Sequence, residues 1–287
     1  MTIPLSLYIH IPWCIRKCPY CDFNSHAVRN SIPEKQYIVK LLIDLQNHQA
    51  HWQDRPIHSI FIGGGTPSLL SAAAYKELFK GLSFHLEIPK DIEITLEANP
   101  GASDQERFSG FREAGINRLS IGIQSWNAEK LQTLGRIHDE QQAEQAVLMA
   151  KKAGFTNFNI DIMHGLPKQT LAEAMLDLER TIACEPTHIS WYQLTIEPNT
   201  FFNRFPPALP EEETLFEIQQ AGRRQLQLAG FNQYEISAYC RKDYFAQHNL
   251  NYWNFGDYIG IGAGAHSKVT LSEGVIWRGW KVKNPKD

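Results

Sequence analysis

Three of the five cysteines in this 287-residue chain lie close together, at Cys14, Cys18 and Cys21, in the spacing Cys-x3-Cys-x2-Cys. They follow a short apolar run that is typical of a strand, so one loop could bring three sulfurs around a single object. Thiolates bind zinc, copper(I) or an iron-sulfur cluster. A structural zinc site needs four ligands, but His10 lies on the predicted strand and His26 lies five residues beyond the third cysteine. A zinc knuckle or chance clustering is therefore the weaker alternative.

The cysteine spacing resembles the signature of the radical S-adenosylmethionine (SAM) enzymes, and the aromatic Tyr20 between the second and third cysteines fits the same pattern. The resemblance implies that Cys14, Cys18 and Cys21 hold three irons of a 4Fe-4S cluster. It also implies that the fourth iron is open to the amino and carboxylate groups of SAM, and an open metal position is catalytic rather than structural. An electron donor would reduce the cluster, and SAM would give methionine and a 5′-deoxyadenosyl radical.

Predicted strands and helices alternate along the chain. Apolar runs predict strands at residues 5–11, 57–62, 92–96, 118–123, 157–162 and 189–195. Apolar residues at helical spacing predict helices at residues 33–49, 71–82 and 104–114, within 128–153, and at 170–183 and 211–229. This alternation predicts an α/β fold with a parallel sheet and right-handed crossovers. With the resemblance, it predicts a radical SAM partial (β/α)6 TIM-like barrel over residues 1–230.

The polar and glycine-rich segments of the chain follow the predicted strands, where the loops of such barrels carry the chemistry. Taken alone, each has an ordinary explanation: a triple glycine is commonly a tight turn, Glu97 would most often be a solvated cap, and Arg136 would be a surface residue. The resemblance implies that glycine backbone binds the SAM ammonium and that Glu97 hydrogen-bonds the ribose hydroxyls. The full set that it implies for SAM is Tyr8, Tyr20, Gly64, Gly65, Thr66, Glu97, Gln124, Arg136 and Asp161, with Thr195 as a further candidate.

Longer strings narrow the resemblance. Residues 8–14, 18–26, 61–68 and 190–200 are similar to the haem-chaperone branch of the oxygen-independent coproporphyrinogen III oxidase family, and the likeness covers essentially the whole chain. Two features favour this branch over the true oxidases. Phe23 stands where the oxidases carry a further cysteine, and the chain is expected to lack the N-terminal extension that reaches into the oxidase active site.

Residues 248–253 read HNLNYW, which looks like the H-N-x-x-Y-W motif of the chaperone branch. The resemblance implies that His248 is an axial ligand of haem iron and that Tyr252 and Trp253 stack on the macrocycle. Taken alone, a histidine in an aromatic segment is more often structural. His266 follows a glycine-rich segment and is a second candidate ligand, although a packing turn explains that segment equally well.

The expected function is that of a haem chaperone, which binds a SAM-liganded 4Fe-4S cluster, carries haem as cargo and transfers it to haem-acceptor proteins. The alternative is an oxygen-independent coproporphyrinogen III oxidase, which decarboxylates propionates by radical chemistry during porphyrin biosynthesis. Haem affinity without porphyrinogen turnover favours the first, and turnover favours the second. Whether the chain is an enzyme stays open, as do the acceptor and the electron donor.

Composition is that of an ordinary globular protein, with 43% hydrophobic and 21% charged residues and a net charge of -3. The charge gives no electrostatic case for nucleic acid. No apolar run is long enough to span a bilayer, and the N-terminus lacks the basic region of a signal peptide. Clustered thiols predict a reducing compartment, the cytoplasm, with peripheral membrane association left open. Cys184 and Cys240 stand alone and are expected to be small buried hydrophobes.

Residues 231–287 are expected to form a C-terminal extension that carries the HNLNYW segment and begins a further domain. The family continues into a mostly helical C-terminal domain, and the resemblance implies that this chain is truncated before it. Residues 205–210, which contain three prolines, predict a rigid loop before the last barrel helix.

Overall fold

The computed structural model describes residues 3–28, 31–52, 55–101 and 105–286. Its strands are, in chain order, β1 (Leu5–Ile11), β2 (Trp13–Cys14), β3 (His26–Ala27), β4 (Ile57–Gly64), β5 (Glu93–Ala98), β6 (Arg118–Gln124), β7 (Phe158–His164), β8 (His188–Gln193), β9 (Asn232–Gln233), β10 (Ala238–Cys240), β11 (Asp257–Ile261), β12 (His266–Thr270) and β13 (Ile276–Trp280).

One sheet of eleven strands carries the described part of the fold, in the order β13-β12-β11-β1-β4-β5-β6-β7-β8-β10-β9. The central strands from β11 to β8 pair in parallel, and the strands outside them pair antiparallel. Among the described residues the edge strands β13 and β9 are not neighbours, so the sheet stays open. All six predicted strands are present, and the predicted α/β, partial-barrel class is confirmed.

Several parallel strands run further than their sequences predict. β4 continues to Gly64 and β5 to Ala98. Pairing with neighbouring strands explains the extra length, because Gly64 of β4 pairs with Ile11 of β1 and Glu97 of β5 pairs with Ser120 of β6. Groups that were expected in loops therefore stand on the ends of paired strands, where the backbone hydrogen bonds fix their positions.

The helices between the strands match the predicted segments closely. They are α1 (Glu34–Gln46), α2 (Gln49–Trp52), α3 (Ala72–Leu82), α4 (Gln105–Ala114), α5 (Ala128–Thr133), α6 (Glu140–Lys152), α7 (Leu171–Ala183), α8 (Phe201–Arg204), α9 (Glu212–Leu228) and α10 (Gln247–Trp253), with a 3-10 turn, η1 (Pro67–Leu69). The segment predicted as one helix at 33–49 ends at Gln46, and α2 follows separately. The predicted start of α4 at Asp104 lies outside the described residues. Across the described ranges, no helix combines the length and the apolar character needed to cross a membrane.

Local capping explains two of these helix starts. Ser71 precedes α3 and its hydroxyl accepts a hydrogen bond from the Ala74 amide at 3.2 Å. Thr170 precedes α7 and forms a reciprocal capping box with Glu173. Each arrangement satisfies backbone N–H groups that have no partner in the first helical turn.

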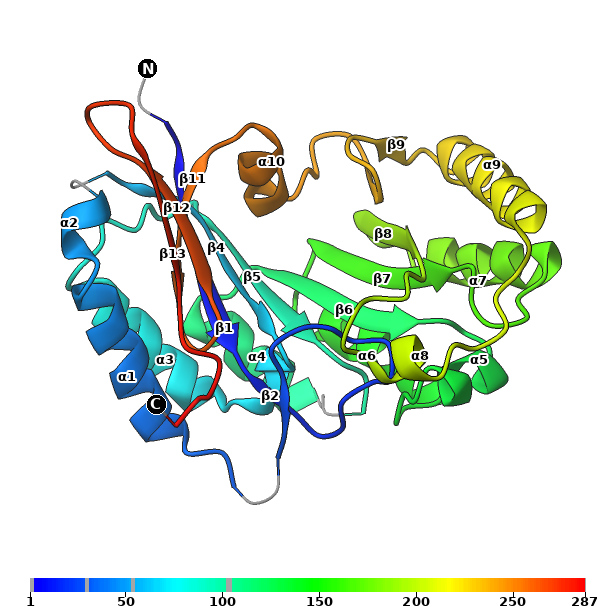
Figure 1. Cartoon of the computed structure of the whole chain (residues 1–287), viewed down its shortest axis with the longest axis horizontal. Helices are drawn as coiled ribbons and strands as arrows, with labels where there is room; N and C mark the ends of the chain where they lie inside the picture. The colour runs from blue at the N-terminus through cyan, green and yellow to red at the C-terminus, as the bar shows by residue number, and fades with distance from the viewer. Residues whose placement is uncertain (1–2, 29–30, 53–54, 102–104, 287) are drawn as a thin grey trace.

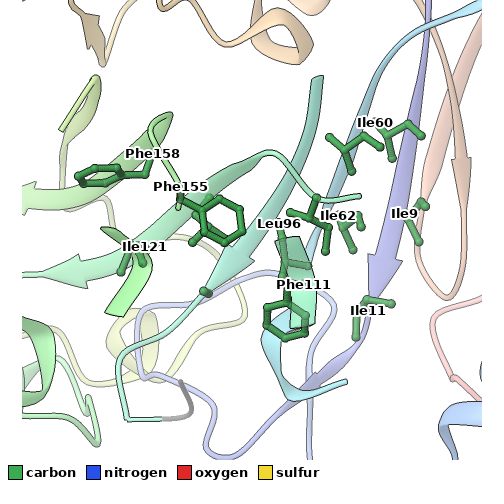
Figure 2. Packing of buried hydrophobic residues seen from close by; sticks show 14 of the residues in the cluster. Ile9, Ile11, Ile60, Ile62, Leu96, Phe111, Ile121, Phe155 and Phe158 are labelled. Atoms are coloured by element: carbon green, nitrogen blue, oxygen red, sulfur yellow. The ribbon is translucent and has the colours of Figure 1, made fainter. Parts of the chain in front are cut away.

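The core lies between the sheet and the helices that cover it. In Figure 1, α1 and α3 stand beside one end of the sheet and α7 and α9 beside the other. Figure 2 shows Ile9, Ile62 and Leu96 from neighbouring strands near Phe111 of α4, and all four side chains are fully buried. Burying a side chain of this size contributes about 1.5–3 kcal/mol, so this cluster stabilises the packing of α4 on the sheet.

Residues 231–286 add strands to both edges of the same sheet. β10 and β9 extend it beyond β8, and β11 pairs in parallel with β1, followed by the antiparallel β12 and β13. The buried Asp257 carboxylate anchors the β11 edge, because it pairs with Arg55 at 2.8 Å and with Lys268 at 2.9 Å. The segment predicted as an extension is thus integral to the sheet.

Candidate functional site

The loop after β1 is held closed by short strands at its two ends. β2 pairs with β3, and the Trp13 carbonyl also accepts the Thr66 amide at 2.7 Å from the end of β4. The three cysteines predicted as ligands, Cys14, Cys18 and Cys21, are half-buried free thiols that line one cavity of about 350 Å³. The loop therefore directs three sulfurs into the space above the carboxyl ends of the strands.

Two of these sulfurs face hydrogen-bond donors. The Thr66 hydroxyl lies 3.6 Å from Cys14 Sγ, and an Arg136 guanidinium nitrogen lies 3.7 Å from Cys18 Sγ. Burial raises the pKa of the Cys14 and Cys21 thiols, so these groups would release protons on binding iron. In the described ranges no set of three His, Cys, Asp or Glu side chains is arranged around a single metal ion. Thiols spread around one cavity fit a cluster, in which each cysteine binds its own iron.

The glycine turn at the end of β4 requires its glycines. A Cβ at Gly65 would lie 2.5 Å from the Trp13 carbonyl oxygen, and Gly64 has φ +116°, a conformation that side chains disfavour. The Gly65 amide donates to the Ile11 carbonyl at 2.8 Å. This backbone lies against the cysteine loop and lines the cavity, as expected for a segment that contacts a ligand through its main chain.

Two carboxyl groups share the cavity wall. Glu97 accepts the Gly64 amide at 3.1 Å, and its pKa is raised to about 8 by burial and then by the nearby Asp161. Burial also raises the pKa of Asp161, which accepts hydrogen bonds from Ser120 at 2.9 Å and Asn159 at 2.8 Å. Hydroxyl donors or a cation in the cavity would stabilise both charged forms.

Gln124 and Arg136 complete the far wall. Gln124 has φ +74° at a register shift between β6 and β7, and its side-chain oxygen accepts the Tyr192 hydroxyl at 2.7 Å. The Arg136 guanidinium donates to Asn99 at 2.7 Å and to the Gly122 carbonyl at 2.6 Å. Arg136 is therefore fixed at the cavity and is not a solvated surface residue.

The structure brings most of the residues predicted for SAM together at this cavity. Its lining includes Tyr20, Gly64, Gly65, Thr66, Glu97, Gln124, Arg136 and Asp161. Tyr8 instead lines the neighbouring cavity, where its ring stacks on Phe61. Thr195 is exposed and bonds to Glu197 rather than lining either cavity.

Sequence reasoning missed several lining residues. Asn99 accepts Arg136 and donates to the Thr66 hydroxyl at 2.9 Å, so it connects two walls of the site. Its position in the polar turn after β5 was the available signal. Ser190 and Tyr192 point into the cavity from β8, and the alternation of a strand alone does not reveal which of its faces meets a ligand.

A second cavity, of about 870 Å³, lies on the other side of Gly64 and Glu97, which line both. Tyr252 and Tyr258 contribute aromatic surface to it, and His266 lies at its edge. Its basic residues come from distant parts of the chain, from Lys17 in the cysteine loop and from Lys283 beyond β13.

His248 lines neither cavity. Its side chain is only 2% exposed, and its two ring nitrogens are hydrogen-bonded to the Ser59 hydroxyl at 3.0 Å and to the Tyr252 hydroxyl at 3.3 Å. Burial lowers the pKa of His248 to about 3, so the ring is neutral. The ring stands behind Tyr252, one residue layer from the second cavity.

The two remaining cysteines line neither cavity, and of the two only Cys240 is fully buried as predicted. Cys240 is buried in β10, and Cys184 is half-buried against the main hydrophobic core. Burial raises the pKa of each thiol to about 11. Both are therefore structural, apolar side chains.

Comparisons with known proteins agree with this geometry. The family model described as the radical SAM superfamily matches residues 8–180. The protein named heme chaperone HemW of Escherichia coli is 54% identical over 283 residues, which are 99% of this chain and 75% of that protein. The HemW of Haemophilus influenzae is 55% identical over 287 residues, with the same shares.

A solved structure gives the same result for the fold. Coproporphyrinogen III oxidase (HemN) from Escherichia coli, described as a radical SAM enzyme, matches with a TM-score of 0.82 and 26% identity, over 96% of this chain and 71% of that one. The sequence relatives, the family model and the cysteine-lined cavity at the strand ends all point the same way. The chain belongs to the radical SAM superfamily and, within it, to the HemW family.

Proposed function

We propose that this protein is a haem chaperone, which binds haem beside a SAM-liganded 4Fe-4S cluster and passes it to haem-acceptor proteins. The observation that carries the proposal is the identity of 54–55% to proteins named heme chaperone HemW, over 99% of the chain. Two adjoining cavities support it, because a cofactor site and a cargo site could share the wall at Gly64 and Glu97.

In the first cavity, Cys14, Cys18 and Cys21 would hold the cluster, which when bound supplies an electron to SAM. The chain's own groups would bind and orient SAM. Glu97 would accept hydrogen bonds from the ribose hydroxyls, and the backbone at the glycine turn would approach the ammonium group. Arg136 and Thr66 place positive or donor groups at the cysteine sulfurs, which stabilises thiolate charge.

In the second cavity, about 870 Å³ of space falls in the range of ligand pockets, roughly 300–1,000 Å³. Its aromatic walls and the basic side chains at its rim suit a flat, apolar macrocycle with carboxylate substituents, although the acidic Asp22 and Glu97 also line it. The sequence predicts His248 as the haem ligand, and binding iron there would require one of its two hydrogen bonds to be broken. Free, clustered thiols support a reducing compartment, so we place the protein in the cytoplasm.

The structural match to HemN favours a second candidate function. With a TM-score of 0.82 to that oxidase, the barrel could bind coproporphyrinogen III in the same second cavity and decarboxylate its propionates. Phe23, at the position of the further cysteine of the oxidases, lines both cavities and argues for the chaperone.

The two functions can be distinguished by testing one protein preparation for both haem binding and turnover. The protein is reconstituted anaerobically with iron and sulfide, titrated with ferric haem by visible absorption, and then assayed with coproporphyrinogen III, SAM and a reductant. We expect saturable haem binding and no protoporphyrinogen. Turnover without haem binding would identify the oxidase, and the absence of both activities would contradict both functions.

A further inference from the structure

We propose that His266 is the ligand of the haem iron, and that Lys17 and Lys283 bind the haem propionates at the rim of the second cavity. This inference rests on the proposed haem-binding function and assigns its cargo site. The iron ligand is then a histidine on β12 and not the buried His248 of the HNLNYW segment.

The other histidines that line the second cavity already have hydrogen-bond partners. His10 is bonded through both ring nitrogens, to the Tyr8 hydroxyl at 3.0 Å and the Asn24 carbonyl at 2.8 Å. His26 bonds through Nε2 to the Lys283 carbonyl at 3.1 Å. Iron binding by His10 would therefore break one of its two bonds, whereas His26 could bind iron only through Nδ1, because Nε2 is already held by the backbone.

His266 differs from these histidines in both exposure and partners. Its side chain is exposed and lines the second cavity. Among the residues that the structure describes, no hydrogen bond involves its ring. An imidazole nitrogen without a hydrogen-bond partner at the wall of an open cavity is available to bind a metal.

The backbone around His266 is rigid. His266 pairs with Trp280 in the β12–β13 ladder. Gly262 and Gly264 have φ +94° and +82° in the turn before it, and a Cβ on Gly260 would lie 2.1 Å from the His266 carbonyl oxygen. The glycines allow β11 and β12 to approach closely, so the chain holds the imidazole at a fixed point on the cavity edge.

The two lysines supply the charge that haem requires, since haem carries two propionate carboxylates. Lys17 is placed by a hydrogen bond from its Nζ to the Phe23 carbonyl at 2.9 Å. The backbone carbonyl of Lys283 accepts the Asn24 side chain at 2.8 Å as well as the ring of His26. These bonds tie the segment after β13 to the cysteine loop and bring both cations to one cavity.

The aromatic wall gives the HNLNYW segment a different role. Tyr252 lines the cavity, lies 3.3 Å from His248 Nε2 through its hydroxyl, and packs edge-on against Tyr258. His248 is in turn fixed by Ser59 on β4. His248 is thus a positioning residue, which orients an aromatic ring against the macrocycle without touching iron.

The test of ligation uses the full chain with ferric haem and four variants, His266→Ala, His248→Ala, His26→Ala and the control His85→Ala, whose histidine lines neither cavity. We expect His266→Ala to weaken haem binding at least tenfold and to change the Soret band and the electron paramagnetic resonance of the iron. Added imidazole should restore the parent spectrum in His266→Ala. We expect His248→Ala to lower affinity while keeping the parent's iron spectrum, and His85→Ala to match the parent.

Two results would overturn the inference. The first is that His266→Ala keeps the iron spectrum of the parent. The second is that His248→Ala or His26→Ala loses the parent's iron spectrum and regains it when imidazole is added. Failure of the parent itself to bind haem would instead reject the proposed function, so the two failures are distinguishable. Circular dichroism of each variant separates loss of a ligand from loss of fold.

The lysines are tested with a matched pair of ligands, ferric haem and its dimethyl ester. The parent should bind haem several-fold more tightly than the uncharged ester, and the Lys17→Gln/Lys283→Gln variant should lose that preference while binding the ester as the parent does. If the variant prefers haem over the dimethyl ester as strongly as the parent does, Lys17 and Lys283 do not bind the propionates.

Discussion

At the scale of single residues, the site depends on groups whose protonation the fold has altered. Glu97 and Asp161 face one cavity, and burial raises the pKa of both carboxyls. Glu97 also accepts the Gly64 amide, which only partly offsets the loss of water. The unliganded site is therefore least stable when both carboxyls are charged.

The substitution Glu97→Gln tests this effect. Because the folded pKa, about 8, lies above the ordinary value of 4.5, the folded state binds the proton more tightly and loses stability as pH rises from about 4.5 to 8. Without SAM, we expect Glu97→Gln to raise the midpoint of thermal unfolding relative to the parent at pH 8 and to have little effect at pH 4.5. SAM affinity should fall. A difference that is constant with pH would contradict the shifted pKa.

The cysteine assignment has a simple chemical test. An anaerobically reconstituted Cys14→Ala variant should lose most of its iron and acid-labile sulfide, because two thiolates retain a cluster poorly. Cys184→Ala is the matched control, since this half-buried cysteine packs against the core away from the cavity, and it should keep the parent's content. Full iron and sulfide in Cys14→Ala would reject the assignment.

At the scale of elements, paired strand ends hold the functional loops. The glycine turn after β4 touches the cysteine loop through the Gly65 and Thr66 amides, and the β11 edge is tied to the rest of the sheet by the buried Asp257. Each of these connections leads to a specific expectation.

A methyl group at Gly65 should disrupt the first connection. In Gly65→Ala the new Cβ would meet backbone at 2.5 Å, so the cysteine loop must shift. We expect a loss of about 1–3 kcal/mol in the free energy of unfolding and weaker SAM binding, measured by denaturant titration and calorimetry. Gly115→Ala is the control: no atom lies within 4 Å of its Cβ, so it should cost only the strain of its backbone and leave SAM affinity intact. Unchanged SAM affinity in Gly65→Ala would contradict this contact.

The Asp257 anchor should show the opposite pH dependence to Glu97. Hydrogen bonds from Thr270 and from Arg55 and Lys268 outweigh burial and lower the pKa of Asp257, so its stabilisation is present above an ordinary pKa of about 4 and is lost in acid. At pH 7, Asp257→Asn removes the carboxylate charge beside the largely buried Arg55 and Lys268, and we expect a loss of about 3–5 kcal/mol. Denaturant titrations at pH 7 and pH 3 measure this. A loss that is undiminished at pH 3 would contradict the mechanism.

At the scale of the whole molecule, local pattern and long-range pairing were predictable to different degrees. The cysteine spacing and the six alternating units fixed the class, because both are local in sequence. The pairing of β11 with β1 was not predictable, since Asp257 and Leu5 lie at opposite ends of the chain. The three-residue β10 is likewise too short for a periodic signal.

The same distinction between local sequence pattern and long-range packing applies to the residues of the candidate site. Glu97 and Asp161 lie at predicted strand ends and were identified through the family resemblance, whereas the positive φ of Gln124 arises from a register shift between neighbouring strands and leaves no mark in the sequence. The burial of His248 behind Tyr252 follows from the packing of α10 on β4, which only the folded structure reveals.

The measurement that tests the chaperone function most directly is haem transfer. The protein is loaded with iron-57 haem and mixed with an apo respiratory haem enzyme in the presence of excess apomyoglobin, which traps released haem. We expect the iron-57 haem to reach the enzyme and to restore its activity faster than the same amount of free haem does when excess apomyoglobin is present. Label found only on apomyoglobin would mean that haem is simply released, and would contradict a chaperone.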